Sequence, residues 1–266
     1  MLSRTLAIAS LALAPASWAQ DAPVPLTKEE VATALETESF SLPMPGELFA
    51  ALSKTGTLDW STALRKTPAG VFTNRPQIAL NLGALVADGY LAVEAKDKAQ
   101  VRRVAQDIKR LAKGLGVQDE IVSRGNSIVE FAEAKQWETL KEELEATQNE
   151  VAAAMAAHKD QELVTLVMLG GWLRGLEVVS TSLAKKHGPD DARLLRQPGV
   201  VDHFVQKLAK MDPKLTDSAL MGSVRLSLFD IKKAVTFSPQ TTPTDEELSR
   251  LAALAVKTVE AISKNE

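Results

Sequence analysis

Two segments with very few polar side chains constrain the fold of this 266-residue chain more than any other feature. They run from residue 78 to 93 and from 163 to 179. Their polar side chains are Asn81, Asp88 and Tyr90 in the first, and Thr165, Arg174 and Glu177 in the second. A helix that is apolar on nearly every face has to be surrounded by other helices. The two segments therefore predict the central pair of a helical bundle.

Glycines interrupt both apolar segments, at Gly83 and Gly89 in the first and at Gly170, Gly171 and Gly175 in the second. Each glycine inside a helix costs up to about 1 kcal/mol relative to alanine. Some other interaction has to offset that cost, and the close approach of a second backbone is the usual one. We expect the two central helices to touch where these glycines lie.

The rest of the chain also has the periodicity of helices. Apolar residues recur every three or four positions, as in Val101, Val104 and Ile108, whereas alternating strand patterns are almost absent. Capping-box patterns begin at Thr27, Asp97 and Thr244. The sequence predicts an all-α, multi-helix bundle of about nine to eleven helices. We place them at 27–37, 45–54, 58–65, 76–95, 98–114, 118–134, 136–158, 161–186, 199–211, 217–236 and 245–264.

The first nineteen residues have the pattern of an export signal. Arg4 precedes an uncharged, mostly apolar run from Thr5 to Ala14, and Ser17 and Ala19 fit the small-residue positions of a cleavage site. The alternative, an N-terminal anchor helix, would need roughly 20 apolar residues to cross a bilayer. No later segment has 18 uninterrupted apolar residues, so we expect no membrane span. These features predict a soluble periplasmic or secreted protein, cleaved after Ala19.

Three regions follow from this reading: a signal peptide at 1–19, a leader with short helices at 20–75, and a helical bundle domain at 76–266. An internal duplication would divide the bundle. Leu82-Gly83 aligns with Leu169-Gly170 at a shift of 87 residues, and later similarities keep the same order. Chance similarity between helices is the other explanation. A true duplication predicts four-helix units at 76–158 and 161–265, related by a pseudo-two-fold axis.

Asp88 and Arg174 are the sharpest chemical features, because an ionised group in an apolar helix needs a partner. We expect them to form one buried ion pair where the central helices cross. Asn81 shares a helix face with Asp88, and Glu177 follows Arg174 by one turn, so both are candidate hydrogen-bond partners. Two alternatives are a polar floor that binds an anionic or polar ligand between the halves, and simple exposure to solvent.

Another polar patch, Arg124-Gly125-Asn126-Ser127, interrupts an apolar stretch. We interpret it as a kink or as the start of a new helix at Asn126 or Ser127, with Glu130 as the capping partner. The alternative is a binding loop in which Arg124 and Asn126 contact a ligand.

Composition and motifs exclude several function classes. The chain has no cysteine, which removes thiolate chemistry and zinc–thiolate sites, and its formal charge of −3 argues against nucleic-acid binding. The three histidines lie in different predicted elements, without the spacing of metal ligands. Ser182 and Lys185 match Ser-x-x-Lys, but no second motif of that active site follows. We therefore expect no cofactor and no catalytic residue.

The remaining function is a non-catalytic binding or interaction role in the periplasm or cell envelope, with an unknown protein or small molecule as the partner. Two alternatives stay open. One is a helical enzyme whose polar groups converge only in three dimensions. The other is a bundle that binds a metal or holds haem non-covalently through histidine and methionine.

Overall fold

The computed structural model is all-helical in the part of the chain that it describes, as the sequence predicts. The described residues are 45–266 without 57, 67–71, 158–159, 189 and 265–266, and the side chains of 119–123 also lie outside the description. The elements are α2 (Pro45–Ser53), η1 (Trp60–Ala63), α3 (Arg75–Glu94), α4 (Lys98–Leu115), α5 (Gln118–Glu133), α6 (Trp137–Ala157), α7 (Gln161–Lys185), η2 (Asp191–Leu195), α8 (Pro198–Lys210), α9 (Pro213–Thr216), α10 (Ala219–Val235) and α11 (Asp245–Ser263).

Most predicted helix ends lie close to the observed ones, and capping side chains begin several of these helices. At α11, Thr244 accepts a hydrogen bond from the backbone N–H of Glu247, whose carboxylate accepts one in return from that of Thr244. At α4, Asp97 caps the first turn, but the side chain of Gln100 donates to the carbonyl of Arg65 and leaves the box half-formed. The predicted signal peptide, the helix at 27–37 and the Thr27 box lie outside the described residues.

The structure corrects three local predictions. Helix α5 is continuous from Gln118 to Glu133, so no new helix starts at Asn126 or Ser127, and the exposed Glu130 caps no helix there. The predicted helix at 58–65 is a single 3-10 turn, because the backbone becomes extended at Leu64 after the Asp59 cap has started it. The expected connection at 187–198 contains the 3-10 helix η2.

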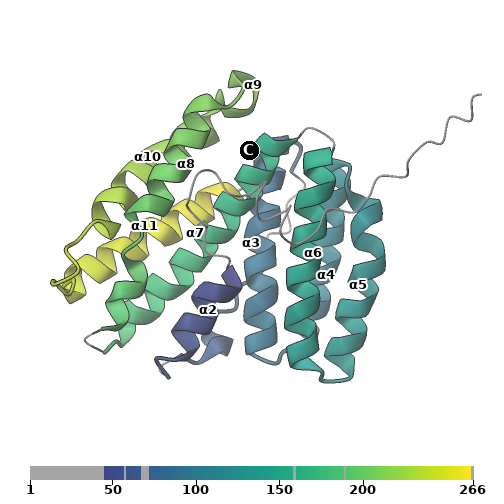
Figure 1. Ribbon diagram of the computed structural model, residues 1–266, viewed down its shortest axis with the longest axis horizontal. Coiled ribbons are helices and arrows are strands. Elements are labelled where there is room, and N and C mark those ends of the chain that lie inside the picture. Colours follow the sequence, from purple (N-terminus) through teal and green to yellow (C-terminus); the bar gives the residue numbers. More distant parts are fainter. Residues whose placement is uncertain (1–44, 57, 67–71, 158–159, 189, 265–266) are drawn as a thin grey trace, which may run out of the picture.

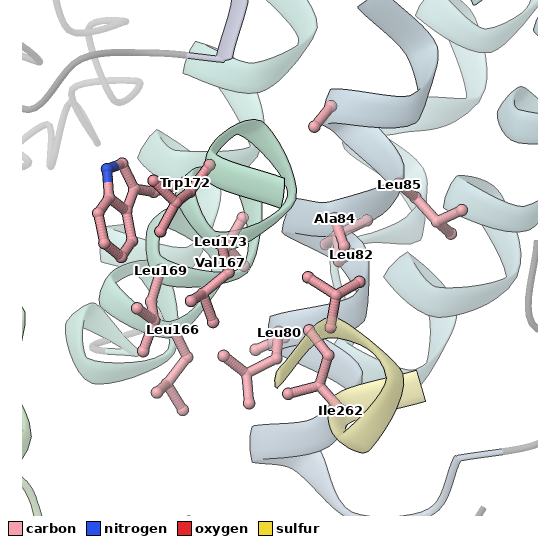
Figure 2. Packing of buried hydrophobic residues seen from close by; sticks show 14 of the residues in the cluster. Leu80, Leu82, Ala84, Leu85, Leu166, Val167, Leu169, Trp172, Leu173 and Ile262 are labelled. Atoms are coloured by element: carbon pink, nitrogen blue, oxygen red, sulfur yellow. The ribbon is translucent and has the colours of Figure 1, made fainter. Parts of the chain in front are cut away.

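Helices α3 and α7 touch backbone to backbone. A Cβ built on Gly83 would lie 1.8 Å from the carbonyl oxygen of Val167, and one built on Gly170 would lie 1.9 Å from that of Leu80. Val167 lies three residues before Gly170, and Leu80 lies three residues before Gly83, so the two contacts are reciprocal. Leucine and valine side chains of the two helices pack beside this crossing (Figure 2). The expected close approach is confirmed, and only glycine permits it at these two positions.

The other helices surround this central pair in two groups (Figure 1). In one group, α3 contacts α4 and α6, and α5 contacts both of those helices. In the other, α7 contacts α8 and α11, and α10 contacts both of those. Each group is therefore a ring of four helices, and α2 packs against α3 and α7 where the rings join.

One described helix, α7, is long and apolar enough to cross a membrane by length and composition. Its most apolar stretch of 18 residues is 83% buried inside the structure. Burial of that kind is typical of the core helix of a bundle.

We predict that Gly83→Ala and Gly170→Ala each lower the free energy of unfolding by about 3 kcal/mol or more, because the added methyl group would force the two backbones apart. Urea unfolding of the purified variants measures this loss. Gly222→Ala in α10 is the matched control. A Cβ there meets nothing within 4 Å, so we expect it to gain up to about 1 kcal/mol from helix propensity. Equal effects at Gly83 and Gly222 would contradict the close contact.

Candidate functional site

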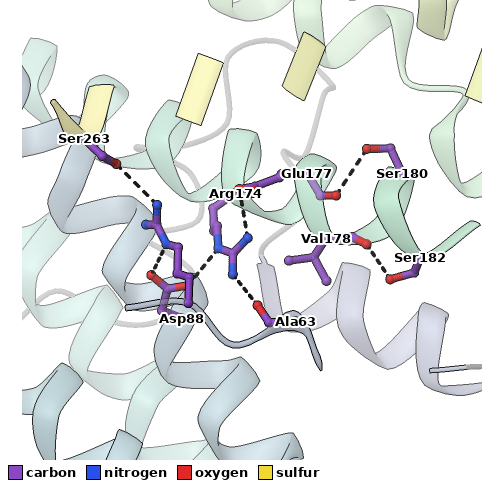
Figure 3. Close-up of polar contacts among 9 residues, drawn as sticks. Ala63, Asp88, Arg174, Glu177, Val178, Ser180, Ser182 and Ser263 are labelled. Atoms are coloured by element: carbon purple, nitrogen blue, oxygen red, sulfur yellow. Dashed lines mark hydrogen bonds and ion pairs between the residues drawn. The ribbon is translucent and has the colours of Figure 1, made fainter. Parts of the chain in front are cut away.

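Asp88 on α3 and Arg174 on α7 meet in the core, as the sequence predicts. The Nε atom of Arg174 donates to Oδ1 of Asp88 at 2.7 Å, and the two side chains are only 4% and 2% exposed. The pair lies close to the Gly83–Gly170 contact, one to two turns further along each helix. Figure 3 shows the carboxylate and the guanidinium directed at one another from the two helices.

Two further charged groups complete this central cluster, which we define as Arg65, Asp88, Arg174 and Glu177. The Nε atom of Arg65 donates to the second carboxylate oxygen of Asp88 at 2.9 Å, and Glu177 lies 2.8 Å from Nη1 of Arg174. Arg174 also donates from Nη2 to the carbonyl of Ala63 at 2.6 Å. The cluster therefore joins three parts of the chain: α3, α7 and the segment that follows η1.

Arg65 was missed in the sequence analysis, because it lies between short elements with no apolar helix around it to mark it as buried. Glu177 is confirmed as a partner of Arg174. Asn81 is not part of the central cluster. Its side-chain amide donates instead to the carbonyls of Gln77 and Ile262, at 2.9 and 2.6 Å.

Asn81 and Gln77 hold the end of α11 against α3. The Gln77 amide donates to the carbonyls of Ile262 and Lys264, at 3.2 and 2.6 Å. The last carbonyls of a helix have no partner within that helix. These two amides supply partners for α11, so their burial has a structural explanation.

The electrostatics of the central cluster follow from burial and from charge pairing. Burial lowers the pKa of Arg174, but the carboxylates of Asp88 and Glu177 more than offset this effect and the net shift is upward. Burial raises the pKa of Glu177, which the two arginines oppose only in part. Two carboxylates face two guanidinium groups, and both oxygens of Asp88 are bonded. This arrangement fixes how the helices dock, and its charged groups already have partners.

Arg124 and Asn126 have separate environments on α5. The guanidinium of Arg124 bridges to α6, with Nε donating to Glu150 at 2.7 Å and Nη1 to Glu143 at 3.0 Å. The hydrogen bond and the charge of Arg124 lower the pKa of Glu150. Asn126 is exposed on the surface of α5. The structure therefore does not bring Arg124 or Asn126 together with the central cluster.

The histidines within the described residues lie apart. The ring of His187 contacts the carbonyl of Leu183 at 2.8 Å, and the ring of His203 packs edge-on against Phe204. Burial, with a contribution from Lys207, lowers the pKa of His203. His158 lies outside the description. Within the described part of the chain, no three histidine, aspartate or glutamate side chains converge as metal ligands would.

Two hollows in the described part of the structure are candidates for a site, one beside each ring. A narrow cavity of about 30 Å³ lies in the first ring, between aliphatic side chains of α3 to α7. That is room for about two water molecules. A surface groove of about 420 Å³ lies in the second ring. It is lined by Asp230, Lys233, Ala234, Thr236, Phe237, Pro243, Glu247, Arg250 and Leu254.

We predict that Asp88→Leu costs more stability than Arg174→Met. The first leaves the buried guanidinium of Arg174 and the partly buried one of Arg65 without their shared carboxylate, whereas the second leaves Asp88 paired with Arg65. Breaking a buried ion pair on one side costs about 3 to 5 kcal/mol. The double variant should cost much less than the sum of the two single losses. Denaturant unfolding of all four proteins provides the comparison, and simple additivity would show that the residues are not coupled.

We also predict a pH dependence from Glu177. Its folded-state pKa lies above the ordinary value of 4.5, so protonation of this carboxyl favours the folded chain. Its stabilising contribution is complete below that value and is lost as pH rises through the folded-state pKa. Glu177→Gln stays neutral throughout. The stability of the wild type relative to this variant should therefore fall as pH rises across this window, as thermal melts in a pH series would show. A constant difference would contradict the prediction.

Comparisons with protein-family models, with curated proteins and with solved structures find no match for this chain. A functional proposal therefore depends on the geometry of the chain itself.

Proposed function

We propose that this chain is an exported, non-catalytic binding protein of the periplasm or cell envelope, and that it binds a small molecule in the groove between α10 and α11. Export is inferred from the signal-peptide pattern of residues 1–19. The observation that carries the binding role is the groove itself. Its volume of about 420 Å³ is within the range of small-molecule sites, roughly 300 to 1,000 Å³.

The walls of the groove are held in place by hydrogen bonds, which supports a preformed site. The Nε atom of Arg196 donates to the carbonyl of Phe237 at 2.8 Å and ties the connecting loop to the rest of the ring. The capping box of Thr244 and Glu247 fixes the start of α11. A rigid site loses less conformational entropy when a ligand binds.

The chemistry of the lining favours a ligand with an apolar body and an acidic group. Phe237 and Leu254 supply apolar surface. The carboxylate of Glu247 is occupied by Thr244, and that of Asp230 lies 3.3 Å from Lys233. The ion pair of Arg250 with Glu246 is largely exposed, and such pairs contribute little. Arg250 can therefore exchange Glu246 for an acidic group on the ligand at low cost.

The groove is on the ring with the longer connections. Loop 236–244 joins α10 to α11, whereas 134–136 joins α5 to α6. The links between the earlier helices of the second ring, 186–197 and 211–218, are likewise longer than 95–97 and 116–117 in the first. Binding residues in proteins concentrate on such loops over a rigid scaffold.

We further infer that the two rings are duplicated units. The same order of helix contacts in both rings and the reciprocal glycine contacts of α3 and α7 support this inference. On this view the second unit gained its groove through longer loops.

Filling the groove tests the binding role. We predict that small molecules extracted from the wild-type protein, purified from the periplasm and analysed by mass spectrometry, are absent from Ala234→Trp, because the indole would occupy the groove. Ala209→Trp, at an exposed position of α8, is the matched control and should retain them. Circular dichroism confirms that both variants fold. Equal retention by both variants, or no retained molecule in the wild type, would refute the binding role.

A further inference from the structure

Three large hydrophobic side chains are exposed in the described part of the chain: Val205, Leu226 and Phe229, at 40%, 70% and 60%. Leu226 and Phe229 are one turn apart on α10 and share its outer face. Single exposed hydrophobic residues are common on protein surfaces, but neighbouring ones indicate a contact surface.

Val205 on α8 belongs to the same patch. Asp202, near the start of α8, forms an ion pair with Lys232, near the end of α10, so the two contacting helices run antiparallel. Val205 is one turn after Asp202, and Phe229 is one turn before Lys232. The two exposed side chains therefore lie at the same level of the pair. We call the surface formed by Val205, Leu226 and Phe229 the α8–α10 patch.

The segment that carries this patch has a net positive charge. Residues 198–235 contain six Lys and Arg against four Asp, in a chain whose formal charge is −3. Two of the aspartates, Asp202 and Asp230, are paired with Lys232 and Lys233. The ammonium of Lys233 also lies 4.1 Å from the ring centre of Phe229. Four cations, Lys207, Lys210, Lys214 and Arg225, and two aspartates, Asp212 and Asp217, are in no ion pair among the described residues, so the unpaired charge is net positive.

We propose that the α8–α10 patch docks on the surface of an anionic phospholipid bilayer. Leu226 and Phe229 would enter the boundary between headgroups and acyl chains, and the surrounding cations would contact lipid phosphates. This combination of apolar tips and a basic rim is typical of proteins that lie on a membrane without spanning it. Each basic residue near an anionic membrane strengthens binding by about fivefold.

A bilayer fits this patch better than a second copy of the chain does. A two-fold dimer through the patch would bring the same four cations of both copies together, which is unfavourable. The apolar side chains also project from an exposed helix face. A lipid interface accepts such projections without a preformed pocket, whereas a protein partner would need a complementary hollow for each.

Vesicle co-sedimentation of the mature chain tests the proposal. The wild type should bind vesicles of phosphatidylglycerol mixed with phosphatidylcholine, bind pure phosphatidylcholine at least about tenfold more weakly, and lose affinity as salt rises. The double variant Leu226→Ser/Phe229→Ser should bind the anionic vesicles at least about tenfold more weakly. None of the residues changed in this experiment lines the groove, so its failure would leave the proposed small-molecule site untouched.

Charge variants provide the matched comparison. Lys214→Gln/Arg225→Gln should weaken binding several-fold, whereas Lys109→Gln/Lys113→Gln, the same change in net charge on exposed positions of α4, should leave it unchanged. Equal losses in both charge variants would show attraction without a specific surface and would overturn the proposal. So would a wild type that binds neutral and anionic vesicles equally or neither. A dimer in analytical ultracentrifugation that the double serine variant dissociates would assign the patch to a second copy instead.

Discussion

The contact between the backbones of α3 and α7 determines the arrangement of everything else in this fold. Because Gly83 and Gly170 each face a carbonyl of the opposite helix, the two axes can approach more closely than side chains would allow. At that separation each helix buries one face against the other helix. Its remaining faces contact the helices of its own ring. This explains why both helices are apolar nearly all round, and why their glycines are tolerated despite the cost in helix propensity.

The central cluster adds specificity to this packing. Apolar side chains alone allow two helices to slide or rotate with small changes in energy, whereas a buried guanidinium has to meet its carboxylate. The Asp88–Arg174 bond fixes the register of α3 on α7 at one point, and Arg65 uses the other oxygen of the same carboxylate to attach the segment after η1. One carboxylate thus sets the position of three parts of the chain.

The sequence predicted the helices and the Asp88–Arg174 pair because both depend on local pattern: apolar period, capping residues, and a charge isolated in an apolar helix. Arg65 could not be predicted, since nothing in its neighbourhood marks it as buried. Asn81 was assigned to the wrong partner because helix periodicity gives a shared face but not which distant segment covers it. The groove could not be predicted either, because its lining comes from a loop and two helices whose relative positions depend on the whole second ring.

The continuity of α5 through Gly125 shows that a polar patch with a glycine does not by itself end a helix.

The amides of Gln77 and Asn81 also bear on the order in which this chain can fold. They lie at the start of α3, yet their partners are carbonyls of residues 262 and 264, more than 180 positions later. Contacts so far apart in sequence form late, because a long loop has to close first. During synthesis from the N- to the C-terminus, α3 can pack against α4, α5 and α6 first. The face of α3 that contacts α7 and α11 stays exposed until those helices form. Gln77 and Asn81 can bond to these carbonyls only when the last turn of α11 is in place, so this part of the core is completed by α11.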